Sequence, residues 1–291
     1  MAGVGYCLLT GRALCVDWRD GMYSDDFSNS FSRWFEIRGV PTVSTLAVET
    51  LCRATPAAVY PPFWTQWLDS GIAVEQLFDN DHMAPANVAR TSLDFTRLDY
   101  PHPVLVGWAW DTGPALRLAP LLRQRFSRFA RDTDAEIVRR LLTEHIYPLP
   151  DLQAEVTSFA DTRFSPERTV GIHIRHTDLQ SPLERMLHTL QSIAGPQDTV
   201  FLATDNAHVE MLVRRLYPHV VFCPKIYPPH DEPLHSHVPG LSSGQKGHEA
   251  LLDMLLLARC HHIIHYAPSS FARIPILLSG LPQAHIHSVT T

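Results

Sequence analysis

The chain has 291 residues, 45% of them hydrophobic and 19% charged, and its formal net charge is −6. This length and balance predict two globular domains of about 120 to 170 residues each. A mildly acidic chain offers no basic surface, so nucleic acid is excluded as an expected partner.

The sequence carries no sign of a disulfide framework or of a membrane span. Its five cysteines form no C-x-x-C pair and are odd in number, which predicts reduced thiols. No apolar run approaches the roughly 20 residues of a spanning helix. The first twelve residues have neither the length nor the flanks of a signal peptide. We therefore expect a soluble, cytoplasmic protein.

The first hundred residues contain few clear elements. Residues 3–10 predict a helix that stops at Gly11. Residues 13–18 and 103–108 are short apolar runs bounded by polar or turn residues, and each predicts a buried strand.

Residues 116–164 have helical spacing. Acidic residues open the stretch 135–147 and basic residues close it, which suits a helix dipole. Pro148 ends that helix, and Asp151 is expected to cap the next one.

After residue 166 strand-like runs alternate with helical patterns. The predicted strands span residues 170–174, 200–204, 220–222, 263–266 and 284–288, and the predicted helices span residues 183–194, 208–216, 248–259 and 271–278. Such alternation predicts a parallel sheet with crossover helices, in which ligands bind beyond the carboxyl ends of the strands. We place the domain boundary so that residues 1–165 and 166–291 form the two domains.

The first predicted strand of the second domain runs directly into His173, Arg175 and Asp178, with the spacing H-x-R-x-x-D. His173 and Arg175 are two residues apart and share one face of the strand. An arginine at the carboxyl end of a strand is well placed to grip a diphosphate through its planar fork. The alternative is an Arg175 paired with Asp178 that only holds the end of the strand, and the spacing leaves both open.

The next strand ends in Thr204, Asp205 and Asn206, directly before a predicted helix. Asp and Asn are favoured residues at the start of a helix. We expect at least one of Asp205 and Asn206 to be a helix cap.

Asp253 lies within an otherwise apolar helical stretch, where an unpaired carboxylate costs several kcal/mol. It either accepts hydrogen bonds from the N1–H and N2–H₂ edge of a guanine or pairs with an arginine. Ser269 and Ser270 are expected to open the following helix, as a phosphate site, as a plain cap, or as both.

The sequence contains two groups of histidines. The H-x-H spacing of His235 and His237 in a proline-rich loop is weak evidence for zinc, and no metal site is predicted. His261, His262 and His265 straddle a strand and are expected to include core imidazoles.

Taken in order, these motifs resemble the α1,6-fucosyltransferase superfamily, which includes the protein O-fucosyltransferases, and most closely the bacterial nodulation fucosyltransferases. The resemblance covers most of the chain. It is carried by residues 10–19, by LPDLQ at 149–153, by GIHIRHTD at 171–178, by FLATDN at 201–206, by PLHS at 233–236 and by the block from 250 to 273.

The resemblance implies an α/β, GT-B-like fold with two Rossmann-like domains facing a cleft. Residues 1–165 would form the acceptor-side domain, lacking the first strand that the family usually has, and residues 166–291 would bind the GDP-sugar. It implies an inverting, metal-independent enzyme that transfers L-fucose from GDP-β-L-fucose to a glycan hydroxyl, α1,6 to GlcNAc. The donor is a substrate, and no cofactor is implied.

Residue roles carry over by position. Arg175 would hold the β-phosphate and stabilise the departing GDP. His173 would border the nucleotide, and Asp253 would read the guanine edge. Ser269 and Ser270 would contact phosphate.

The remaining assignments concern the donor side and the general base. His176, Asp205 and His235 are further candidates for donor contacts. Asp178 and Glu184 are the two candidates for the base that takes the acceptor proton.

Two departures from the family affect the base and the acceptor contacts. Leu179 stands where some relatives have a basic residue, and the segment between Asp178 and Val200 is short. Two alternative functions therefore stay open: transfer of another GDP-sugar, and an inactive relative that binds a nucleotide sugar or a glycan.

Overall fold

The computed structural model describes the chain except for residues 20–22, 27, 67–77, 79–83, 109–110 and 228–239. The chain divides into two compact units, which are described separately. Unit 1 comprises Met1–Gly21 and Asp26–Pro148, and unit 2 comprises Met22–Asp25 and Leu149–Thr291. The units therefore divide between Pro148 and Leu149, before the helix Pro150–Arg163. The predicted boundary, at residue 165, lies after this helix. The roles assigned to residues 1–165 and 166–291 stay predictions.

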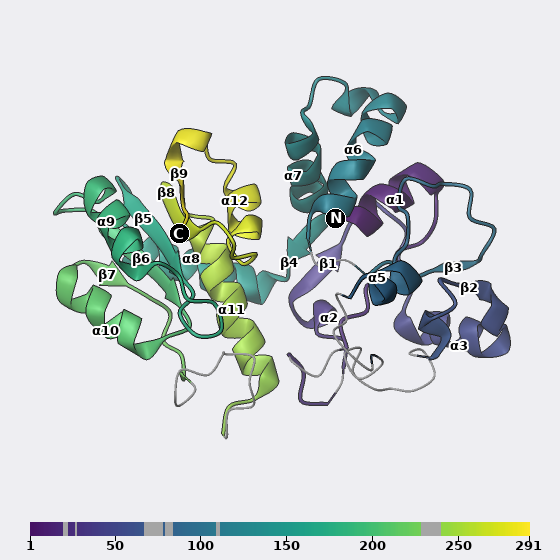
Figure 1. Ribbon diagram of the computed structural model, residues 1–291, viewed down its shortest axis with the longest axis horizontal. Helices are drawn as coiled ribbons and strands as arrows, with labels where there is room; N and C mark the ends of the chain where they lie inside the picture. The colour runs from purple at the N-terminus through teal and green to yellow at the C-terminus, as the bar shows by residue number, and fades with distance from the viewer. Residues whose placement is uncertain (20–22, 27, 67–77, 79–83, 109–110, 228–239) are drawn as a thin grey trace. The chain divides into compact units, whose positions relative to one another are not determined.

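Unit 2 is built on a five-stranded sheet in which every neighbouring pair is parallel. Its strands are β5 (Thr169–Ile174), β6 (Thr199–Thr204), β7 (Val220–Val221), β8 (His262–Tyr266) and β9 (Ile286–Val289). Their order is β7-β6-β5-β8-β9 (Figure 1). This is the Rossmann order, which reverses direction between β5 and β8, and ligands bind at such a reversal.

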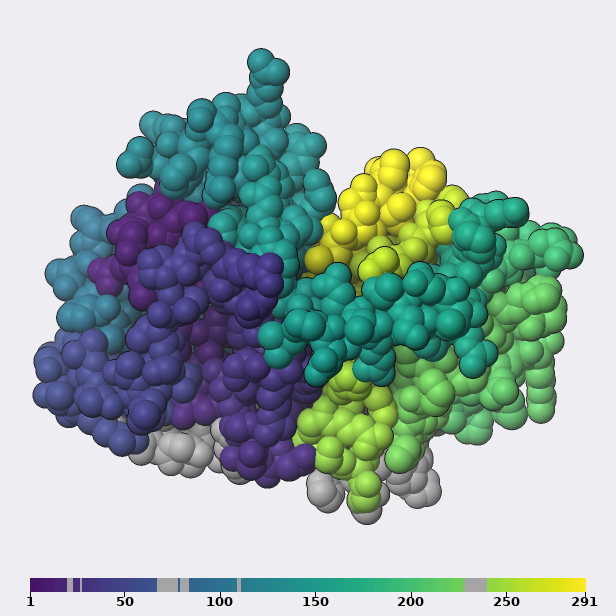
Figure 2. Space-filling view, turned by 180° about the vertical axis from the view of Figure 1, so that it is seen from behind, coloured from purple at the N-terminus to yellow at the C-terminus, as the bar shows by residue number. Residues whose placement is uncertain are grey.

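The helices of unit 2 are α8 (Pro150–Arg163), α9 (Leu183–Ile193), α10 (Ala207–Leu216), α11 (Ser243–Leu257) and α12 (Arg273–Ser279). α8 packs against α11 and lies on the outer surface of the unit (Figure 2). Among the described residues, the five strands and the four helices α9–α12 that separate them confirm the predicted alternation, and α8 precedes it. α11 begins five residues earlier than the pattern indicated, because the hydroxyl of Ser242 accepts from the Gln245 amide and caps the helix there.

Successive side chains of β5 point to opposite faces of the sheet, so they contact different helices. Val170, Ile172 and Ile174 belong to one buried cluster with side chains of α9 and α10. On the opposite face, a Cβ at Gly171 would lie 2.7 Å from the Cys260 sulfur. Glycine therefore lets the end of α11 approach the strand closely, and His173 emerges on this same face.

A short segment from the N-terminal half belongs to unit 2. Asp25 accepts a hydrogen bond from the backbone amide of Ser243 at 2.6 Å, at the start of α11. A carboxylate at a helix N-terminus is stabilised by the free amides there.

Unit 1 has shorter strands. Its helices are α1 (Ala2–Thr10), α2 (Phe31–Trp34), α3 (Thr45–Ala54), α5 (Pro85–Thr91), α6 (Gly113–Arg125) and α7 (Asp134–His145). Its strands are β1 (Phe35–Ile37), β2 (Val59–Tyr60), β3 (Val104–Leu105) and β4 (Ile146–Pro148), paired as antiparallel β1-β4 and parallel β2-β3. Side chains of α1, α6 and α7 form its main core.

Several predictions for unit 1 are confirmed and several are wrong. The first helix ends at Gly11, which adopts a left-handed φ of 72°, as predicted. The strand predicted at 13–18 is reduced to a single bridge between Leu14 and Thr42, and that at 103–108 to the two residues of β3. Apolar runs this short do not distinguish a strand from a buried loop.

The N-terminus of α8 also differs from the prediction. Leu149 is the N-cap and Pro150 opens the helix, so Asp151 lies in the first turn and is not the cap. Proline takes the first position because its missing N–H would have no partner there. Asp151 instead interacts favourably with the helix dipole.

The described residues include all five cysteines, and none of these forms a disulfide. In the described part of the chain, no helix has the length and apolar character needed to cross a membrane.

Three histidines gather around His262, the first residue of β8. His262 contacts His287 through ring nitrogens 3.2 Å apart and stacks on His285 at 4.4 Å between centroids. Arg168 approaches His262 at 3.4 Å, and His261 adjoins the group. Burial, together with the charge of Arg168 and the other histidines, lowers the pKa of His262 to about 4. The imidazole is therefore neutral at pH 7.

We predict that His262→Gln weakens the acid dependence of stability. Unfolded His262 takes up a proton near pH 6.5, whereas folded His262 does so only near pH 4. The folded state is therefore favoured fully above pH 6.5, and this advantage falls away between pH 6.5 and 4. Urea denaturation from pH 6.5 to 4 should show a smaller decrease in the free energy of unfolding for His262→Gln than for wild type. The exposed His208 provides the control, since the free energy of unfolding of His208→Gln should depend on pH as it does in wild type. Equal slopes for all three proteins would contradict the prediction.

Candidate functional site

Arg175 and Asp178 form an ion pair just beyond the carboxyl end of β5. The Arg175 Nε donates to the Asp178 Oδ1 at 2.7 Å, and the Nη2 donates to Oδ2. The two side chains are 28% and 36% exposed, so the pair is at the surface of the unit and not in its core. Burial lowers the pKa of Arg175, but its bonds to Asp178 outweigh this and raise it, so the guanidinium is charged. The pairing leaves the Nη1 group directed at no hydrogen-bond acceptor in the described part of the chain.

The Arg175 loop is held in shape by the next strand. The two carboxylate oxygens of Asp205 accept from the His176 amide at 2.7 Å and from the Thr177 hydroxyl at 2.5 Å. Asn206 donates to the His176 carbonyl at 3.1 Å. Both oxygens of Asp205 are therefore committed to the protein, and Asp205 positions the loop that carries Arg175.

Asn206 is also the cap of α10. Its side-chain oxygen accepts from the amides of His208 and Val209 at 2.9 and 3.1 Å. The prediction that one of Asp205 and Asn206 caps the helix is confirmed for Asn206.

His173 lies on the α11 face of β5, buried at 6% exposure. Its ring stacks on Phe271 with 4.6 Å between centroids and 16° between planes. Burial, with the nearby His265, Arg175 and Lys225, lowers the pKa of His173 to about 3, so the ring is neutral. Its Nδ1 is buried and has no hydrogen-bond partner among the described residues.

Asp253 lies on α11 and forms a buried ion pair with Lys225. The Lys225 Nζ donates to the Asp253 Oδ2, and the two side chains are only 2% and 5% exposed. The partner is therefore a lysine, whereas the sequence suggested an arginine. Burial raises the pKa of Asp253, and Lys225 opposes this shift.

The serine pair after β8 does not begin the next helix. α12 starts at Arg273, and Ser269 and Ser270 lie in the turn before it. The expectation that they cap this helix is wrong, because the Ser270 carbonyl instead accepts from the Arg273 amide in a turn. Ser270 is exposed, whereas Ser269 is 1% exposed with a hydroxyl that has no partner among the described residues.

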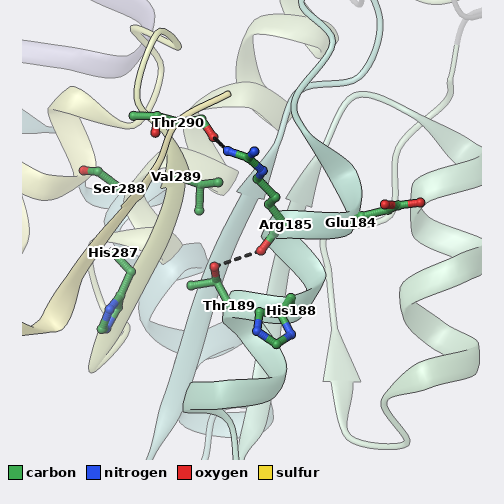
Figure 3. Close-up of a pocket in the computed structure, with 8 residues that line it drawn as sticks. All are labelled: Glu184, Arg185, His188, Thr189, His287, Ser288, Val289 and Thr290. Carbon is green, nitrogen blue, oxygen red and sulfur yellow. Dashed lines mark hydrogen bonds between the residues drawn. The ribbon is translucent and has the colours of Figure 1, made fainter.

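Glu184 is exposed in the first turn of α9. It borders an open pocket of about 630 Å³ between α9 and the end of β9, which is lined by Glu184, Arg185, His188, Thr189, His287, Ser288, Val289 and Thr290. Figure 3 shows the Glu184 carboxylate pointing away from the other labelled side chains. Arg185 closes one end of the pocket by donating to the Thr290 carbonyl at 3.2 Å.

Two of the remaining predicted residues are less informative. His176 has a buried Nδ1 without a partner among the described residues, while its backbone is held by Asp205 and Asn206. His235 lies outside the described residues. Within the part of the chain that the structure describes, no three His, Cys, Asp or Glu side chains are grouped so that they could hold a metal ion.

The sheet brings Arg175 and Ser269 to the carboxyl ends of its two central strands, β5 and β8. Sequence analysis missed Lys225 and Phe271, which contact Asp253 and His173. Phe271 directly follows the two predicted serines in the sequence, so this position could have indicated that it belongs to the site. Lys225 lies in the loop after β7, where no sequence motif marks it as a site residue.

Comparison with known proteins finds similarity to nodulation proteins. The family described as Nodulation protein Z (NodZ) matches residues 185–281. Nodulation protein Z of Bradyrhizobium diazoefficiens is 26% identical over 296 residues, covering 90% of this chain and 69% of that protein. Nodulation protein Z of Azorhizobium caulinodans is 27% identical over 304 residues, covering 95% and 83%.

Solved structures give the same family. A crystal structure of NodZ α-1,6-fucosyltransferase soaked with GDP-fucose matches with a TM-score of 0.64 and 27% identity, covering 95% of this chain and 86% of that one. Fucosyltransferase NodZ from Bradyrhizobium matches with a TM-score of 0.61 at 25% identity. The resemblance drawn from the motifs and the α/β, GT-B-like fold are thereby confirmed. The cleft and the missing first strand of the N-terminal domain stay predictions.

We predict that Asp205→Ala destabilises the protein by about 1–3 kcal/mol, because it leaves the His176 amide and the Thr177 hydroxyl without their acceptor. Chemical denaturation measures the change. Asp161→Ala, at an exposed position of α8, should alter stability by less than about 0.5 kcal/mol. Equal stability of the two variants would show that Asp205 does not hold the loop.

Proposed function

We propose that this chain, which belongs to the α1,6-fucosyltransferase superfamily, transfers L-fucose from GDP-β-L-fucose to a hydroxyl of a glycan acceptor, α1,6 to GlcNAc. The observation that carries the proposal is the charged Arg175 at the end of the central strand, braced by Asp178. Support comes from the likeness to a fucosyltransferase whose crystals were soaked with GDP-fucose.

The proposed chemistry is an inverting transfer without a metal ion. As the bond between fucose and GDP breaks, negative charge accumulates on the departing diphosphate. A guanidinium already oriented toward that charge stabilises the transition state more than the ground state. The bidentate bond to Asp178 fixes the plane of the Arg175 fork, and Asp205 fixes the loop beneath it. This arrangement reduces the reorganisation needed during the reaction.

The nucleotide would occupy the face of the sheet where His173 emerges. We assign Asp253 to the guanine edge and His173 to the border of the base. Ser269 is assigned to phosphate, since its hydroxyl is buried and has no partner among the described residues. His176, Ser270 and His235 remain secondary candidates for donor contacts.

The general base is assigned by elimination between the two candidates. Both Asp178 oxygens accept from Arg175, and a carboxylate held by a guanidinium is a weak proton acceptor. Glu184 is exposed and accepts no hydrogen bond within the described part of the chain. We therefore propose that Asp178 orients Arg175 and that Glu184 takes the proton of the acceptor hydroxyl.

The proposal includes the setting of the reaction. We place the protein in the cytoplasm, with a GDP-sugar and an oligosaccharide or glycoconjugate as its partners, and with no role for nucleic acid.

We predict that Arg175→Ala lowers kcat for fucosyl transfer by about 10²–10³-fold, the loss typical of removing one donor that stabilises transition-state charge. Mass spectrometry of GDP-fucose turnover against a panel of GlcNAc-terminated acceptors measures it. The matched control is Arg214→Ala on α10, whose side chain is 58% exposed and paired with Glu210. Its turnover should stay within about twofold of wild type.

Two results would count against the assignment. Turnover in Arg175→Ala equal to that of Arg214→Ala would remove Arg175 from the reaction. Absence of turnover in wild type with every acceptor, although GDP-fucose binds, would favour the inactive nucleotide-sugar-binding relative.

We also predict that EDTA leaves the rate of turnover unchanged. Arg175 is assigned the role that a divalent ion has in metal-dependent transferases. Turnover is measured after dialysis against EDTA and again after addition of Mg²⁺ or Mn²⁺. A loss of activity that either ion restores would refute the metal-independent mechanism.

A further inference from the structure

Asp253 has two carboxylate oxygens in different situations. The side chain is 5% exposed, and Oδ2 accepts from Lys225. Oδ1 is buried and accepts from no N–H or O–H group in the described part of the chain, while the Cys223 thiol, a weak donor, hydrogen-bonds this carboxylate. A buried acceptor without a partner costs free energy, which a ligand that brings a donor would recover. The unmatched oxygen thus indicates a ligand with an N–H group.

Lys225 is held so that it faces this carboxylate. Its Nζ also donates to the Thr204 carbonyl at 3.3 Å, at the carboxyl end of β6, and its side chain is 2% exposed. The sequence contains only one other lysine, Lys246, beside 22 arginines. A compact ammonium fits where a planar guanidinium would need more space and more acceptors.

The other titratable groups around Asp253 cannot replace Lys225. They are Cys223, Tyr227 and Glu249, which are neutral or acidic, and His173, which interacts electrostatically with Lys225. A carboxyl group such as Glu249 cannot be cationic, and burial lowers the pKa of His173 to about 3, so neither supplies positive charge at pH 7. Among the described residues near Asp253, Lys225 is the cation that opposes its protonation.

The protonation state of Asp253 decides which base edge it can match. An ionised carboxylate accepts at both oxygens, with about four lone-pair sites, so Oδ2 can hold Lys225 and still accept a second donor. Guanine presents two parallel donors, N1–H and N2–H₂. A protonated Asp253 would place an O–H against one of these donors and lose that bond. Hypoxanthine, which lacks the 2-amino group, needs only one acceptor.

We propose that Lys225 is a specificity-determining residue, which keeps Asp253 as a double acceptor and so makes the site selective for guanine over hypoxanthine. This inference rests on the proposed function, in which Asp253 meets the base of the donor nucleotide. Lys225 acts through Asp253 and is a positioning residue.

The test is calorimetric titration of the full chain with GDP and with IDP, the inosine analogue, between pH 6.5 and 8, where N1–H of both bases stays protonated. Wild type should prefer GDP by about tenfold or more, the value of one hydrogen bond to a charged group, at every pH. In Lys225→Met the ammonium no longer opposes the effect of burial, so the pKa of Asp253 rises further. The preference should then fall to about twofold at the acid end of the range and recover as the pH rises.

Matched variants separate this role from a structural one. Lys246→Met should retain the wild-type preference at each pH. Lys225→Gln keeps a neutral donor for Oδ2, so it gives the same test if Lys225→Met does not fold. In the double variant Lys225→Met/Asp253→Asn the preference should be small and independent of pH, because the titrating group is absent.

The outcomes are distinguishable. An unchanged GDP preference in both Lys225 variants at every pH overturns the inference and leaves the proposed function intact. An equal loss of GDP and IDP binding, without a change in their ratio, also overturns it. A wild-type chain that binds neither nucleotide contradicts the proposed function, on which the inference depends.

Discussion

The burial of β5 on both faces is the constraint on which the rest of unit 2 depends. Its apolar face packs with α9 and α10, while Gly171 on the other face lets α11 approach. A strand enclosed in this way cannot shift its register without exposing its apolar side chains. Arg175 lies one residue beyond the strand. Its position is therefore fixed by the packing of the β5 side chains, which begins at Val170.

Two ion pairs in this unit differ in their surroundings. The Arg175–Asp178 pair is about one-third exposed, so its charges remain partly solvated and available to an anionic ligand. The Lys225–Asp253 pair is almost fully buried, where neither charge would be tolerated without the other. The first arrangement suits a group that meets a diphosphate, and the second suits a group that recognises the neutral edge of a base.

Sequence periodicity predicted the second domain well and the first poorly. Strands buried on both faces of a parallel sheet are continuous apolar runs, and those at 170–174 and 200–204 were correctly located. In unit 1 the described strands are two or three residues long, which is too short for any period to emerge. The serine turn before α12 was misassigned because Ser is equally common in turns and at helix caps.

The sequence by itself determined the order of strands and helices in unit 2 and the resemblance to the α1,6-fucosyltransferase superfamily. It also indicated the candidates Arg175, Asp253 and Ser269, because these follow from local pattern and motif. Only the tertiary structure decided which distant residue pairs with Asp253 and which one braces the loop that carries Arg175. Lys225 lies 28 residues from Asp253 along the chain, and Asp205 lies 29 residues from His176. The second pair forms because the parallel strands β5 and β6 bring their carboxyl ends to one edge, and the first forms because α11 packs against the sheet. No local spacing in the sequence encodes either relation.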